Sequence, residues 1–130
     1  MKNHGYVFVY GSLKIGGHFS ANFDKDRVSV TPAKVNGTLY KLRWPGLVLG
    51  GEKPVHGELH LYREFRFVVK HMDYIEGYRK RNDDSNLYDK NVVEVETEEG
   101  KKVKATVYTL NTLKTSVEGC EIVDDGVWPI

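Results

Sequence analysis

One segment of this 130-residue chain carries helical periodicity, and it lies between segments that carry strand periodicity. Apolar residues recur at three- and four-residue steps from Phe65 to Ile75, which predicts an amphipathic helix, and Gly77 is a suitable residue to end it. A doubly wound α/β fold would need several more helices. The pattern therefore favours an α+β domain with a small, barrel-like mixed sheet, one main helix and short additional helical turns, such as one at residues 19–23.

The predicted strands are short and are bounded by turn residues. They comprise residues 6–10, 34–42, 55–62, 92–96 and 103–110. The first is continuously apolar, which indicates a strand covered on both faces. Gly37 indicates a bulge in the second, and residues 98–101 form a hairpin signal between the last two. Trp44-Pro45-Gly46 predicts a turn after the second strand, because Pro45 disfavours helix before it and Gly46 permits a positive φ. Residues 79–87 are charged and turn-rich, and predict a solvated loop, while Trp128 and Ile130 suggest that the tail docks.

Composition limits the class of protein. Hydrophobic residues make up 40% of the chain, which is enough for one packed domain spanning residues 1–130. The 19 Lys and Arg residues balance 18 Asp and Glu residues, so charge gives no argument for nucleic acid or an anionic membrane. Cys120 is the single cysteine, which excludes an intramolecular disulfide. No apolar stretch has signal-peptide length or approaches the ~20 residues of a membrane span. We therefore expect a cytoplasmic protein.

The corner after the first strand reads Tyr10-Gly11-Ser12-Leu13. Gly11 would allow the backbone to turn sharply and leave the next N–H groups free to bind an anion such as a carboxylate. A plain strand-ending turn explains the same residues, and spacing alone favours it. The sequence GSLKIGG fits neither a P-loop nor a dinucleotide-binding fingerprint. Ser12 lacks the GxSxG surroundings of a nucleophile elbow.

Two carboxylates lie three residues apart near the end of the predicted helix. Asp73 and Glu76 share one side there, where the negative end of the helix dipole disfavours them. The apolar and aromatic side chains beside them are Met72, Tyr74, Ile75 and Tyr78. Crowding by these side chains would bury Glu76 in part and raise its pKa toward that of a general base. A solvated helix face is the alternative, and spacing does not decide between them.

The segment HGELH places His56, Glu58 and His60 on one face of a predicted strand. A zinc or iron site is sterically conceivable there. The segment is not the metalloprotease motif HExxH, because its glutamate is in third place and the segment is a strand. An ordinary polar strand face is the better interpretation.

Residues 10–13 and 73–78 together resemble the γ-glutamylcyclotransferase-like superfamily, which includes AIG2-like proteins and γ-glutamylamine cyclotransferases. They match its YGS/TL motif and its DxxEG/Sx motif, in order and at a suitable separation. Further similar segments are Trp44–Leu47, Val55–Leu59, Tyr88, Ala105–Tyr108 and Ile122–Trp128. The resemblance therefore covers nearly the whole chain.

Three residues depart from the family pattern. Lys90 replaces a usual arginine, His60 stands where tyrosine is common, and Val127 replaces an aspartate. Lysine lacks the planar fork of arginine, so we expect a weaker loop-ordering contact at Lys90. None of the three departures falls on the Asp73–Tyr78 motif, which keeps its glutamate, Glu76. They leave the identity of the substrate undetermined.

The resemblance implies a small barrel-like fold and conversion of a γ-glutamyl amine or amide into 5-oxoproline and free amine, with no cofactor or metal. Glu76 would act as general base and then general acid. The N–H groups of residues 10–13 would bind the substrate's α-carboxylate or the developing oxyanion. Tyr88 and Tyr108 would line the pocket.

The resemblance implies a small γ-glutamyl substrate as the partner, and the charge balance predicts neither nucleic acid nor a membrane as a partner. The sequence leaves open whether the chain is a monomer or a homodimer. Two other functions remain open from the residues alone. One is a non-catalytic small-molecule-binding or regulatory module with the same pocket. The other is a metal-dependent hydrolase that uses His56, Glu58 and His60.

Overall fold

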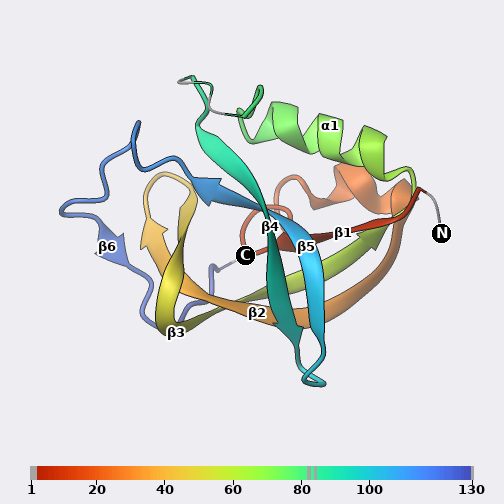
Figure 1. Ribbon diagram of the computed structural model, residues 1–130, viewed down its shortest axis with the longest axis horizontal. Coiled ribbons are helices and arrows are strands. Elements are labelled where there is room, and N and C mark those ends of the chain that lie inside the picture. Colours follow the sequence, from red (N-terminus) through yellow and green to blue (C-terminus); the bar gives the residue numbers. More distant parts are fainter. Residues whose placement is uncertain (1–2, 82, 84, 130) are drawn as a thin grey trace.

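In residues 3–81, 83 and 85–129, which the computed structural model describes, five strands close into a mixed barrel (Figure 1). The elements in chain order are β1 (Gly5–Val9), the 3₁₀ helix η1 (Ser20–Asp26), β2 (Arg27–Lys41), β3 (Pro45–Tyr62), α1 (Phe65–Ile75), β4 (Tyr88–Thr97), β5 (Lys102–Leu110) and β6 (Glu121–Ile122). The order around the barrel is β3-β1-β5-β4-β2, and pairing of β2 with β3 closes it. Strands β1 and β5 are parallel, and the other neighbours are antiparallel. The predicted α+β class and barrel-like sheet are confirmed.

Strand β1 runs between two hydrophobic clusters. Phe8 and the adjoining Tyr10 belong to a cluster that draws residues from all five barrel strands and so fills the barrel interior. Val7 and Val9 point to the opposite side and pack in a second cluster with residues of α1 and η1. Both helices lie on that side of the barrel (Figure 1). The continuous apolar run of β1 is explained by these two buried faces, as predicted.

Helix α1 has the predicted bounds and ends in a Schellman motif. Gly77 is left-handed with φ of 66°, the Tyr78 N–H donates to the Asp73 carbonyl at 2.8 Å, and the Gly77 N–H donates to the Tyr74 carbonyl at 3.3 Å. Glu76 is therefore the C-cap residue. Among the described residues, no helix is long and apolar enough to cross a membrane.

Strand β2 begins at Arg27, seven residues before the predicted start, and its pairing with β3 shifts register between Asn36 and Gly37. That irregularity confirms the predicted bulge. A Cβ at Gly37 would lie 2.6 Å from the Val48 carbonyl oxygen, so the close approach of β3 requires glycine.

The predicted turn at Trp44-Pro45-Gly46 is wrong in its position. The bend covers residues 42–44, and β3 already begins at Pro45. Gly46 does not have a positive φ. A Cβ there would crowd the side chains of Leu42 and Leu110, at 2.9 and 3.0 Å, so packing and not turn geometry requires the glycine.

The end of the chain follows the predicted pattern in two places. Residues 98–101 connect β4 to β5 as a hairpin, with the Thr97 N–H donating to the Lys101 carbonyl at 2.8 Å. The tail returns to the barrel, where Trp128 packs against the interior cluster. Ile130 lies outside the described residues.

Candidate active site

A cavity of about 160 Å³ lies beside the end of β1. It is lined by the corner after that strand, the end of α1, and the start of β4 together with the end of β5. The residues that the family resemblance assigns to the site all line it: Tyr10, Gly11, Ser12, Leu13, Glu76, Tyr88 and Tyr108. Segments that are distant in the sequence therefore meet at one cavity.

Several apolar residues that line the cavity were not predicted from the sequence as site residues. They include Phe8, Phe19, Trp44, Pro45, Ile75 and Leu87. Leu87 belongs to the loop that was expected to be solvated, and its neighbour Asn86 is fully buried. The Asn86 Oδ1 accepts from the Arg79 N–H at 2.8 Å, and its Nδ2 donates to the Lys80 carbonyl at 2.8 Å. That end of the loop is therefore folded into the molecule, while residues 82 and 84 lie outside the described residues.

Glu76 presents a partly buried carboxyl group to the cavity. Burial raises the pKa of this carboxyl from 4.5 to about 7. No hydrogen bond or ion pair to the carboxylate is found within the described residues, so nothing offsets the loss of solvation. A group with a pKa near neutrality can accept and return a proton at physiological pH.

The predicted crowding around Glu76 is correct only in part. Ile75 lines the same cavity, and Met72 is fully buried. Tyr74, in contrast, is 85% exposed on the outer side of α1 and does not shield the carboxyl.

Glutamine at position 76 is expected to stabilise the fold at alkaline pH. The raised pKa means that the native state holds its proton more tightly than the unfolded chain, so stability is full below pH 4.5 and is lost as pH rises through about 7. This shift corresponds to at most about 3 kcal/mol. Glu76→Gln should therefore exceed wild type by about 1–3 kcal/mol at pH 8 and by much less at pH 4.5, as measured by urea denaturation. Equal differences at both pH values would contradict the raised pKa.

Three tyrosines surround Glu76, and each hydroxyl donates to a fixed protein acceptor. Tyr10 donates to the Tyr108 carbonyl at 2.6 Å, Tyr88 donates to the Pro45 carbonyl, and Tyr108 donates to the Asp73 Oδ1 at 2.6 Å. Burial, assisted by the nearby Glu76 carboxylate, raises the pKa of all three hydroxyls. The tyrosines are therefore neutral, rigid walls of the cavity.

Asp73 has a structural environment that differs from that of Glu76. Its Oδ1 accepts from Tyr108, and its Oδ2 accepts from the Lys90 Nζ at 2.9 Å. The Lys90 ammonium also lies 4.7 Å from the centre of the Tyr78 ring. Asp73 thus links the end of α1 to β4 and β5. Of the two carboxylates of the motif, Glu76 is the one without a partner among the residues that the structure describes.

The corner at residues 10–13 carries unpaired backbone donors. Within the described residues, the N–H groups of Gly11, Ser12 and Leu13 have no protein acceptor. The turn is closed by the Lys14 N–H, which donates to the Gly11 carbonyl at 3.0 Å. Three adjacent free donors beside a cavity are suited to binding an anionic group.

Gly11 is required for a reason other than the predicted one. It does not have a positive φ, so the turn alone does not demand glycine. A Cβ at this position would lie 2.4 Å from the Pro45 Cγ. The glycine therefore allows the corner to approach the opposite wall of the cavity.

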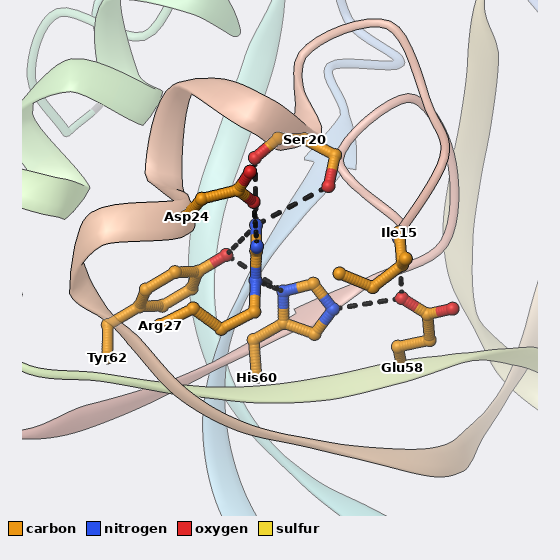
Figure 2. A network of polar contacts seen from close by, with 7 residues as sticks. All are labelled: Ile15, Ser20, Asp24, Arg27, Glu58, His60 and Tyr62. Carbon is orange, nitrogen blue, oxygen red and sulfur yellow. Dashed lines mark hydrogen bonds and ion pairs between the residues drawn. The ribbon is translucent and has the colours of Figure 1, made fainter.

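The geometry of the described residues does not support a metal site at His56, Glu58 and His60. Among the described residues, no group of three His, Cys, Asp or Glu side chains is placed to hold a metal ion. His56 is exposed, whereas His60 is fully buried and bonded through Nε2 to the Glu58 Oε1 at 2.9 Å (Figure 2). The interpretation of HGELH as an ordinary polar strand face is also wrong at His60, because η1 and the loop before it cover that part of the strand.

Residues 7–129 match the model of the family described as γ-glutamyl cyclotransferase, AIG2-like. The chain belongs to this family. The resemblance inferred from the sequence is thereby confirmed. No curated protein sequence matches the chain.

Solved structures of similar fold come from several organisms. YkqA from Bacillus subtilis has a TM-score of 0.70 and 22% identity over 96% of this chain, which spans only 39% of YkqA. An AIG2-like protein from Mus musculus has a TM-score of 0.64 and 18% identity, covering 94% of this chain and 87% of its own. The Arabidopsis thaliana protein At3g28950.1 has a TM-score of 0.64 and 25% identity, covering 98% and 70%. The family fold therefore extends over nearly all of this chain.

Proposed function

We propose that the protein is a cyclotransferase that converts a γ-glutamyl amine or amide into 5-oxoproline and the free amine. The observation that carries the proposal is the shared cavity. A Glu76 carboxyl with a pKa of about 7 lines it together with the amides of Gly11, Ser12 and Leu13, and none of these groups has a hydrogen-bond partner in the described part of the chain. The family description supports the same reaction class.

Glu76 supplies both proton transfers in the proposed mechanism. It removes a proton from the substrate's α-amine, and the amine nitrogen attacks the γ-carbonyl carbon to form a five-membered ring. The bond between that carbon and the leaving nitrogen then breaks as Glu76 returns the proton to the leaving nitrogen. The reaction consumes no water, and each proton taken is given back. Because the attack is intramolecular, holding the substrate in a folded conformation supplies much of the acceleration.

The amides of residues 11–13 orient the substrate in this mechanism. A carboxylate accepts readily from adjacent backbone N–H groups, and the cavity walls exclude much of the competing water. Binding the α-carboxylate there places the α-amine of the same carbon close to the amides. Glu76, on another wall of the cavity, can then reach the amine.

The rate is expected to depend on pH through Glu76. Only the unprotonated carboxylate can act as the base, so kcat/KM should rise with pH and level off above an apparent pKa near 7. Initial rates of 5-oxoproline release between pH 5 and 9 measure the profile. A profile that already levels off near pH 4.5 would show that the carboxyl has an ordinary pKa.

Incubation with a panel of γ-glutamyl amines, γ-glutamyl amino acids and glutathione, assayed for 5-oxoproline, tests the proposal. At least one compound should give 5-oxoproline without added metal or cofactor. Calorimetric binding of panel members without any product would contradict the enzyme and favour a binding module. Activity that chelators abolish would favour the metal-dependent alternative.

A further inference from the structure

A largely buried polar network contacts the segment that follows the Tyr10–Leu13 corner, and the proposed reaction does not use it. It consists of the side chains of Asp24, Arg27, Glu58, His60 and Tyr62, joined to the main chain at Ile15 and Ser20 (Figure 2). His60 and Tyr62 are fully buried, and the Arg27 side chain is only 8% exposed. Burying a guanidinium and an imidazole is costly unless their polar atoms are paired. The hydrogen bonds of this network supply those partners and so fix the positions of its side chains.

The contacts of His60 fix its tautomer. The Arg27 Nε can only donate, and it lies 3.2 Å from the His60 Nδ1. The Nδ1 is therefore the acceptor, and the Nε2 carries the hydrogen that is donated to the Glu58 Oε1 at 2.9 Å. Burial, opposed by the hydrogen bond to Glu58, lowers the pKa of His60, so the ring is neutral at neutral pH. The imidazole thus bridges a cation and an anion in one defined orientation.

The network holds the segment after the Tyr10–Leu13 corner at two points. The Glu58 Oε1 accepts from the Ile15 N–H at 2.8 Å, and the Arg27 Nη2 donates to the Ser20 carbonyl at 2.9 Å. Among the described residues, Glu58 is the one side chain that accepts a hydrogen bond from the backbone of residues 11–15. The segment that carries the free amides is therefore tied to β3 through this carboxylate.

We propose that Glu58 is a positioning residue for the substrate-binding amides, and that His60 and Arg27 hold it in place for that purpose. The inference rests on the proposed function, because it assigns the amides to the substrate's carboxylate. Glu58 does not touch the cavity, and it acts through the Ile15 N–H, two residues beyond Leu13. Its loss should weaken substrate binding and leave the proton transfers of Glu76 in place.

The test compares Glu58→Ala, Glu58→Gln and His56→Ala in the full chain. His56 is the matched control, because it lies on the same strand, two residues away, and is exposed. Glu58→Ala should raise KM about 10-fold, the loss expected for a charge-assisted hydrogen bond, and change kcat by less than about 3-fold. Glutamine keeps an acceptor oxygen and should restore most of the affinity. His56→Ala should match wild type in both constants.

Amide hydrogen exchange of residues 11–19 provides a second measurement that does not depend on turnover. In Glu58→Ala, exchange of the Ile15 amide should be at least about 10-fold faster than in wild type. Unchanged exchange at Ile15, or faster exchange with unchanged KM, would overturn the positioning role. A kcat loss equal to the KM effect would also overturn it. If wild type forms no 5-oxoproline, the proposed function fails, while exchange at Ile15 still decides whether Glu58 orders the segment.

Discussion

Replacing Glu76 by glutamine is expected to lower kcat at least ~10²-fold, the usual scale for removal of an acid–base group. Glutamine has nearly the same shape as glutamate, so the substrate should still bind. It cannot accept a proton at neutral pH, so the proton transfers should fail. The chemistry fails because no other carboxylate lines the cavity among the described residues: Asp73, three residues earlier, is bonded to Tyr108 and Lys90. Steady-state kinetics with the best compound of the panel measure the loss.

Glu94→Gln provides the matched control for that experiment. Glu94 lies on β4 and is exposed to solvent, so the same chemical change there should leave kcat at the wild-type value. The circular dichroism spectra of both variants should equal that of wild type. Wild-type turnover in a folded Glu76→Gln variant would remove Glu76 from the mechanism.

Gly11→Ala is expected to lower kcat/KM by between about 10- and 100-fold, because a misplacement on the ångström scale is enough for such a loss. The added Cβ would lie 2.4 Å from the Pro45 Cγ, so the corner with its free amides must move away from the opposite wall. Substrate orientation then suffers, although no polar group has been removed.

Removing the Pro45 Cγ, which the added methyl group would contact, provides a control for this variant. In a Pro45→Ala background the nearest Pro45 atom that remains is Cβ, at 3.5 Å from the new methyl group, which is ordinary contact. Gly11→Ala should then cost less than about 3-fold in kcat/KM relative to Pro45→Ala alone, and the double-mutant cycle gives the coupling. An equal loss in both backgrounds would show that the clash is not the reason for the glycine.

The parts of the fold that follow from local patterns were predicted accurately. The predicted bounds of α1 match the observed ones because both signals are local in the sequence. The apolar periodicity defines the helix, and the left-handed Gly77 ends it. The two buried faces of β1 follow from its unbroken apolar run, and the bulge follows from Gly37. The convergence of Tyr10–Leu13 with Glu76 in one cavity was expected from the family resemblance.

The features that were missed depend on contacts between distant segments. Alternation along β3 marks Glu58, His60 and Tyr62 as a polar face, yet the segment around η1 covers them. The burial of His60 depends in part on Arg27, 33 residues earlier, which supplies a donor to its ring. The role of Gly11 depends in the same way on Pro45, which packs against it from another strand. No local pattern contains these pairings.

The stoichiometry of products from a single wild-type reaction tests the central claim most directly. Cyclisation predicts that 5-oxoproline and free amine appear in equal amounts at equal rates, with no free glutamate at early times, because water does not take part. Quantification of all three products by mass spectrometry distinguishes this reaction from hydrolysis. Free glutamate and amine in equal amounts, without 5-oxoproline, would contradict the proposed reaction.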